Sequence, residues 1–283
     1  LALLLIDNSS NAALQSSLTA IGTLVLVGLA LTVPTAMRWV PDDSKARPEG
    51  NNLQGAWRLL ITPSPFRRLL FAFLLNGVAN AIPATLFLLF VTHVLRSPEL
   101  AGPVLFLYFL CSAVSVPFWV AVARRFGKHQ TWCAAVSMAC VFFAGAPFLG
   151  AGDTIWYVAI VVGTGLMIGA DLALPSAING DLIEWDAHEN GQQRPGLFFA
   201  LWGTASKLAF ALAVGLVFPL LDIIGFDAAA SNSTEDIRAL AILYGGPSIL
   251  FKLAAVALMH NFPIDEAEHG RIRNALAASG QPA

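Results

Sequence analysis

A lysine lies deep inside one of the long apolar segments of this sequence. Lys207 comes about eleven residues into the run 197–221, roughly 16 Å from its start, which is near the midplane of a bilayer. A lysine side chain cannot reach water from that depth, so its ammonium must face an aqueous cavity or an acidic partner. It is therefore either a ligand-contacting residue or a packing lysine paired with a neighbouring carbonyl or acid.

Two more ionisable residues lie within apolar segments. Lys252 is roughly eight residues from the end of its segment, partly within snorkelling distance of water. We therefore favour a structural role for it. Asp171 lies about ten ångströms from the end of its segment. It could pair with Lys207, coordinate a cation, cap a helix break at Pro175 or contact a cytoplasmic loop.

An amide pair follows helical spacing in another apolar segment. Asn76 and Asn80 are four residues apart, so they share one helix face, with Pro83 and Thr85 just beyond them. Uncharged amides on a kinked helix can hydrogen-bond a hydroxylated ligand. They can equally link neighbouring helices, with a contribution of about 1 kcal/mol or less.

The segment 179–195 is acidic, with four acids and one arginine. Three of these acids are candidate functional residues: Asp181, Glu184 and Asp186. They could bind a metal ion or a diphosphate, or they could form a salt-bridged gate with a basic loop that contains Arg124 and Arg125. A metal site would need a second acidic cluster, and the other cytoplasmic loops are mainly basic. We therefore favour the gate and expect neither metal ligands nor catalytic residues.

The composition sets the class of protein that must hold these residues. Of 283 residues, 57% are hydrophobic and 12% are charged, against about 25% charged in ordinary soluble domains. The formal net charge of −2 gives no basic excess for nucleic acid. The three cysteines lie inside apolar runs and form no disulfide framework. The chain is therefore predicted to be an integral membrane protein.

Six apolar stretches meet the length of about 20 residues that a membrane-spanning helix needs, and a seventh, 239–260, also qualifies if it tolerates Lys252. They are continuous and do not alternate with period two, so an all-α bundle is expected and a barrel is not. The predicted spans are 18–37, 69–94, 101–122, 131–150, 155–178, 197–221 and 239–260.

Basic residues are concentrated on one side of this topology. Of 16 lysines and arginines, all but Arg96, Arg238, Lys207 and Lys252 fall in alternate connecting segments. The positive-inside rule makes those segments cytoplasmic. The cytoplasmic segments are then 38–68, 123–130, 179–195 and 261–283.

The chain is expected to be the C-terminal part of a longer protein. Its apolar stub Leu1–Ile6 resembles the end of a span, with no basic segment before it. Six spans follow a polar linker, an arrangement typical of one half of a two-half transporter. The expected parts are 1–40, the end of the first half; 41–65, the linker; 66–261, the six-helix bundle; and 262–283, the tail.

Two stretches resemble a known family. The residues from Leu174 to Asp186 and from Gly191 to Lys207 are similar to the region of helices ten and eleven in the glycoside–pentoside–hexuronide:cation symporters. These are the melibiose-permease-like branch of the major facilitator superfamily. Their pattern is an acidic loop, a Gly/Arg turn and a lysine within the next helix. The turn Arg124–His129 resembles the basic turn between helices eight and nine.

The resemblance implies alternating access around a central site. It places Lys207 near the sugar and cation sites, with Gly203 and Thr204 facing roughly the same way and Trp202 available to stack on a sugar ring. It also implies a coupling cation, Na⁺ or H⁺, whose ligands lie mostly in a first half that this chain lacks. No other cofactor is expected.

The leading hypothesis is a secondary transporter that moves a sugar or glycoside with a cation. One alternative is a polytopic membrane enzyme, such as a prenyl transferase that uses Asp181, Glu184 and Asp186. Another keeps the transporter fold with a lipid-type substrate. The expected partners are the small-molecule substrate, the bilayer and the first half of the same protein, and the expected location is the bacterial inner membrane.

Overall fold

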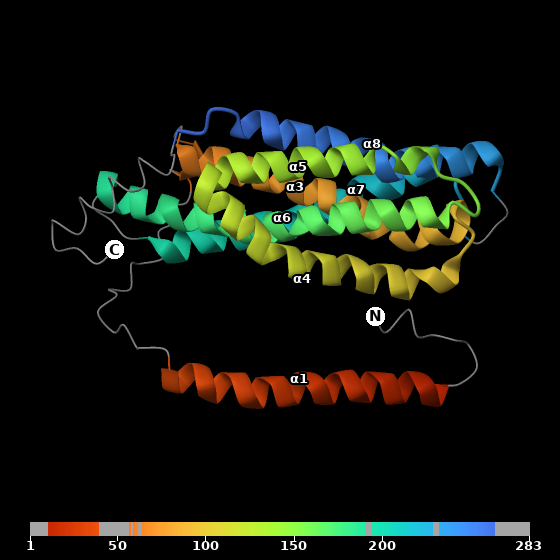
Figure 1. Cartoon of the computed structure of the whole chain (residues 1–283), viewed down its shortest axis with the longest axis horizontal. Coiled ribbons are helices and arrows are strands. Elements are labelled where there is room, and N and C mark those ends of the chain that lie inside the picture. Colours follow the sequence, from red (N-terminus) through yellow and green to blue (C-terminus); the bar gives the residue numbers. More distant parts are fainter. Residues whose placement is uncertain are drawn as a thin grey trace. The chain divides into compact units, whose positions relative to one another are not determined.

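The computed structural model describes residues 11–39, 57, 59–61, 64–190, 194–228 and 232–263 (Figure 1). Within them all regular structure is helical, and seven helices are long and apolar enough to cross a membrane. The predicted all-α membrane helix bundle is thereby confirmed, and each predicted span falls on one of these helices.

The chain divides into two compact units, residues 1–51 and 52–283. The first contains α1 (Asn11–Trp39), whose described side chains are nearly all exposed. Its hydroxyls Thr23 and Thr32 donate to carbonyls four residues earlier, at 2.8 Å and 2.7 Å, which satisfies them inside an apolar helix. Most of the expected linker and tail lies outside the described residues, so the domain boundaries remain predictions.

In its described residues, besides the helical positions 57 and 59–61, the second unit holds six long helices and three short helical turns. In chain order they are α3 (Pro65–Leu89), the π-helical turn η2 (Phe90–Val94), η3 (Pro98–Leu100), α4 (Ala101–Phe126), α5 (Lys128–Phe143), η4 (Ala146–Phe148), α6 (Thr154–Asn190), α7 (Pro195–Ile223) and α8 (Thr234–Met259).

Local sequence signals fix several helix ends. Ser64 caps α3 by accepting the backbone N–H of Arg67, with Pro65 in the first turn. Ser233 and Asp236 form a reciprocal capping box at the start of α8. Gly127, with φ of 88°, makes the sharp turn between α4 and α5, a conformation that favours glycine.

Helix α6 extends beyond its predicted span. Residues 179–190, expected in a cytoplasmic loop, continue the helix to Asn190. A helix of 37 residues is about 55 Å long, well beyond the roughly 30 Å of hydrocarbon. Ion pairs hold the extension: Lys128 contacts Asp181 at 2.7 Å, and Arg194 contacts Asp186 at 2.7 Å. The acidic segment is therefore mainly helix.

Two sets of helices form the bundle in Figure 1. Helix α3 packs against α7 and α8, α6 packs against α4 and α5, and α5 also contacts α8. Glycines allow the closest approach: a Cβ on Gly165 would lie 2.9 Å from the carbonyl oxygen of Tyr108, and one on Gly169 would lie 2.8 Å from that of Ser112. Both glycines therefore allow α6 and α4 to pack closely.

Candidate functional site

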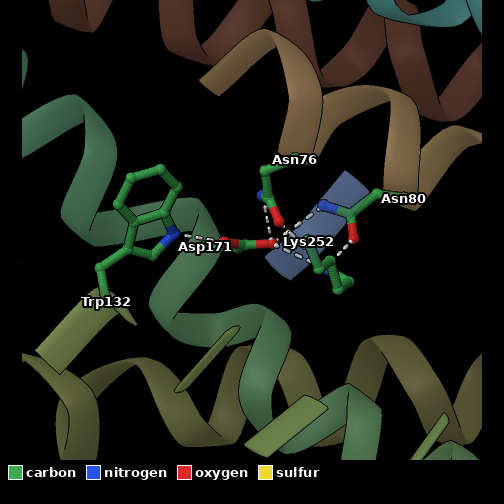
Figure 2. Close-up of polar contacts among 5 residues, drawn as sticks. All are labelled: Asn76, Asn80, Trp132, Asp171 and Lys252. Carbon is green, nitrogen blue, oxygen red and sulfur yellow. Dashed lines mark hydrogen bonds and ion pairs between the residues drawn. The ribbon is translucent and has the colours of Figure 1, made fainter. Parts of the chain in front are cut away.

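Five polar side chains from four helices meet inside the bundle (Figure 2). Asn76 and Asn80 come from α3, Trp132 from α5, Asp171 from α6 and Lys252 from α8. We call these five residues the polar cluster. Asp171 lies at its centre and accepts hydrogen bonds from three of the others.

Both amides use both of their ends within the polar cluster. The Nδ2 groups of Asn76 and Asn80 donate to Oδ2 of Asp171 at 2.8 Å and 2.9 Å. Their Oδ1 atoms accept from Nζ of Lys252 at 3.1 Å and 2.7 Å. Helical spacing makes this possible, because residues four apart stand one above the other on a helix face. The amide pair thus bridges the acid and the base.

The electrostatics of the polar cluster are those of a compensated buried ion pair. Nζ of Lys252 lies 3.8 Å from Oδ2 of Asp171, and the two side chains are 7% and 8% exposed. At that separation the Coulomb attraction is about 4 kcal/mol with an effective dielectric constant of 20. The indole N–H of Trp132 donates to the other carboxylate oxygen, Oδ1. Each charge is therefore met by an opposite charge and by hydrogen bonds, as buried ions require.

A small cavity adjoins the polar cluster. It has a volume of about 40 Å³, and Asn80, Asp171 and Lys252 line it. Its further polar lining residues are Tyr108, Thr164 and Ser248. A cavity of this size with these polar groups in its wall can accommodate water, but it is far too small for a sugar or a lipid headgroup. In this conformation, this cavity can hold small species only.

The structure brings together three of the sequence-predicted residues, Asn76, Asn80 and Asp171. The acid pairs with Lys252 and not with Lys207, so that alternative was wrong. Lys252, expected partly within snorkelling distance of water, is instead buried within the bundle, and its structural role stays a prediction. Asp171 is also farther from the end of its helix than expected, because α6 continues for 19 residues beyond it. Trp132 was missed, since an indole in an apolar run carries no distinctive sequence signal.

Lys207 lies elsewhere, on the exposed face of α7. In the described part of the chain it makes no ion pair. Thr204 is also exposed, and its hydroxyl donates to the carbonyl of Ala200 at 2.8 Å. Gly203 is half-buried, with open space where a Cβ would stand. Trp202 is separate from this face, because it is buried and stacks on Phe73 with ring centroids 3.7 Å apart.

The expected gate has different partners from those predicted. Arg124 and Arg125 are exposed, and neither pairs with the acidic segment among the described residues. Asp181 instead contacts Lys128, three residues beyond that basic pair, through both carboxylate oxygens. Helix α5 begins at Lys128, whereas the two arginines lie in the last turn of α4; both helices pack on α6.

The other two acids of this segment also lie on α6. Asp186 is buried and is held by a bidentate contact from Arg194, while Glu184 is half-buried. In the residues described, no group of three or more His, Cys, Asp or Glu side chains is arranged to hold a metal ion. A diphosphate–metal site at these acids therefore has no support in the geometry.

The fold and the polar cluster define an integral membrane helix bundle with ionisable groups held inside it, as is common in transport proteins. A model of the family described as MFS/sugar transport protein, where MFS denotes the major facilitator superfamily, matches residues 2–266. The chain belongs to this family.

Similar proteins carry lipids. The chain is 25% identical over 225 residues to a human protein named sodium-dependent lysophosphatidylcholine symporter 1, covering 78% of this chain and 41% of that protein. It is 26% identical over 212 residues to a sphingosine-1-phosphate transporter of Mus musculus, covering 72% of this chain and 42% of that one. The chain thus spans less than half the length of these curated relatives.

These likenesses revise the functional reading. The relatives are named as transporters or symporters, and the family is a transport family and not an enzyme family, which excludes the prenyl transferase alternative. The superfamily implied by the sequence resemblance is confirmed. Its melibiose-permease-like branch is not shown, because these relatives are lipid carriers and not sugar symporters.

Proposed function

We propose that this chain is part of a cation-coupled secondary transporter whose substrate is an amphiphilic lipid with a phosphate in its headgroup. Lys207 binds that headgroup. The observation that carries the proposal is a single ammonium near the middle of α7, exposed on a helix face that is otherwise almost wholly apolar. Family membership and the lipid substrates in the names of the relatives support the same reading.

The face of α7 suits an amphiphile better than a sugar. Around Lys207 its exposed side chains are mostly hydrophobic, for example Phe210 at 61% and Phe218 at 53% exposure. A sugar site needs several convergent hydrogen-bonding groups. A lipid needs one charge for its headgroup and a continuous apolar surface for its chain, and this face offers both.

The residues first considered for sugar contacts are engaged elsewhere. Asn76 and Asn80 have both amide ends occupied within the polar cluster. One ring face of Trp202 is covered by Phe73. In the proposal the amides position Asp171 and Lys252, and Thr204 and Gly203 border the headgroup beside Lys207.

The energetic cost of Lys207 fits a binding role. A lysine at the centre of a spanning helix costs about 2.5–3.5 kcal/mol on insertion scales. A headgroup phosphate close to the ammonium offsets that cost, whereas a lipid without a charged group cannot. Transport of an uncharged monoacylglycerol should accordingly be much weaker than transport of a lysophospholipid.

The coupling cation is proposed to be Na⁺, because the human relative is named as sodium-dependent. Asp171 already has Lys252 as its counter-ion, so a coupling role for this acid requires that pair to open during the cycle. The ion pairs at Asp181 and Asp186 hold the α6 extension to α5 and α7, while Glu184 lies between them on the same extension. The segments around Arg124 and Arg125 and the tail are proposed to face the cytoplasm, in line with their basic charge.

The test is uptake into proteoliposomes that contain the full-length protein. Labelled lysophosphatidylcholine and labelled melibiose are compared, with and without an inward Na⁺ gradient. We expect Na⁺-stimulated uptake of the lipid, a loss of at least tenfold in Lys207→Ala and partial recovery in Lys207→Arg. Arg238→Ala, which removes an exposed cation from the first turn of α8, is the matched control.

Each outcome of this assay has a distinct meaning. Uptake of melibiose without uptake of the lipid would show that the protein is a transporter whose substrate is a sugar and not a lipid. Unchanged lipid uptake in Lys207→Ala would remove this residue from the headgroup site. Lipid uptake that is independent of the Na⁺ gradient but is driven by a proton gradient would show that the coupling ion is H⁺ and not Na⁺.

A further inference from the structure

A groove with two arginines lies at the end of the bundle where α3 begins and α8 ends. Its volume is about 490 Å³. Ser64, Arg67, Arg68, Phe71 and Leu75 line it from α3 and its cap, and Leu258 lines it from α8. None of these lining residues is acidic, and α7 contributes nothing to the groove. It is therefore separate from the face that carries Lys207.

The groove is polar at one end and apolar along its length. Ser64 and Arg67 lie in the cap and first turn of α3. Phe71 and Leu75 follow at four and eight residues beyond Arg67, which places them about 6 Å and 12 Å further along the helix and on the same face. Phe71 is 47% exposed and Leu258 is 37% exposed. The charge gradient matches that of a lipid lying parallel to the helix.

The two arginines have different tasks. Arg68 donates through Nε, Nη1 and Nη2 to the carbonyls of Leu258, Asn261 and His260, so it caps the C-terminal end of α8, where a positive charge is favourable. Arg67 uses Nη1 for the carbonyl of Ile61 at 2.8 Å. A guanidinium has five N–H donors, so most of those on Arg67 remain for another acceptor.

In the part of the chain that the structure describes, neither Arg67 nor Arg68 forms an ion pair with a carboxylate. The C-terminal end of α8 offers Arg68 a partial negative charge, whereas Arg67 donates to the neutral carbonyl of Ile61. Basic pockets between spanning helices bind anionic headgroups, and a guanidinium matches a phosphate through paired N–H donors.

We propose that this groove binds an anionic phospholipid of the surrounding leaflet as a resident lipid. Arg67 and the hydroxyl of Ser64 hold the phosphate, and one acyl chain lies along Phe71, Leu75 and Leu258. The lipid joins the beginning of α3 to the end of α8 and is not the transported substrate.

The experiment is native mass spectrometry of the full-length protein with added dioleoylphosphatidylglycerol or dioleoylphosphatidylcholine. We expect preferential retention of phosphatidylglycerol and about tenfold weaker binding in Arg67→Gln. Arg125→Gln removes an exposed arginine in the last turn of α4, which does not line the groove, and should leave binding unchanged. Phe71→Ala keeps the charge but removes part of the chain contact, so it should weaken binding several-fold.

Three results would overturn the proposal of a resident lipid. The first is equal binding in Arg67→Gln and Arg125→Gln, and the second is equal affinity for the two lipids. The third is displacement of the lipid by millimolar inorganic phosphate, which would indicate a site for free anions. Lys207→Ala separates this site from the proposed function, because it should abolish transport and leave phosphatidylglycerol retention intact. Arg67→Lys, which keeps the charge and loses the paired donors, should retain partial binding if the fold is unaffected.

Discussion

Removing both members of the buried ion pair should destabilise the bundle by less than the sum of the two single removals. In Asp171→Asn the ammonium of Lys252 stays buried without a counter-ion, and the new NH2 group faces either the indole N–H of Trp132 or the amide N–H groups of Asn76 and Asn80. Loss of one partner of a buried pair costs about 3–5 kcal/mol. We expect a decrease in unfolding free energy in that range.

The complementary change is Lys252→Met, which keeps the length of the side chain without its charge. It removes the attraction across 3.8 Å and the two hydrogen bonds to Asn76 and Asn80. The carboxylate of Asp171 keeps its three N–H donors, so the decrease in unfolding free energy should be smaller than in Asp171→Asn, about 2–3 kcal/mol. The double variant Asp171→Asn/Lys252→Met contains no unpaired charge, and its loss should fall about 2 kcal/mol below the sum of the single losses.

The measurement is equilibrium unfolding of the purified protein in mixed detergent micelles. Lys207→Met is the matched control, because it is the same substitution on the exposed face of α7 and should change the unfolding free energy by no more than about 0.5 kcal/mol. Losses that add within about 0.5 kcal/mol would show that Asp171 and Lys252 do not interact. That result would contradict the geometry of the polar cluster.

Three further changes test the packing around the site. Gly169→Val should lower the melting temperature markedly, because a Cβ there would meet the backbone of α4. Gly215→Ala is the control, because a Cβ at Gly215 meets nothing within 4 Å, and it should be neutral or slightly stabilising. Thermal denaturation of the two variants makes the comparison. Asp186→Asn should weaken the contact with Arg194 and speed amide hydrogen exchange in the last turns of α6. Ser233→Ala removes the capping box of α8 and should cost about 1 kcal/mol, measured by equilibrium unfolding.

Most of the fold could be predicted from composition and apolar run length. Each predicted span is a helix, because the hydrocarbon of a bilayer imposes both a length and an internally satisfied backbone. The prediction failed at the end of α6, where hydropathy changes but the helix does not. Two ion pairs stabilise that part of the helix, Asp181 with Lys128 and Asp186 with Arg194. A hydropathy pattern does not predict such tertiary contacts.

The members of the site were easier to predict than their grouping. The spacing of Asn76 and Asn80 and the intramembrane Asp171 are visible in the sequence. Which lysine meets the acid depends on how α3, α6 and α8 pack, through contacts between residues 95 and 176 positions apart. No local pattern fixes that packing, so Lys207 and Lys252 could not be distinguished as partners by their depth alone.

The two intramembrane lysines illustrate why burial alone does not define a substrate site. The charge of Lys252 is already neutralised by Asp171 and shared with two amides, so a ligand would have to displace those contacts to use it. The same contacts join α3, α6 and α8 through one buried centre, which favours movement of these helices as a unit, as alternating access requires. Lys207 has no such compensation among the described residues, so its charge remains available to a substrate. Under the proposed function, the cluster supplies rigidity and the exposed lysine supplies recognition.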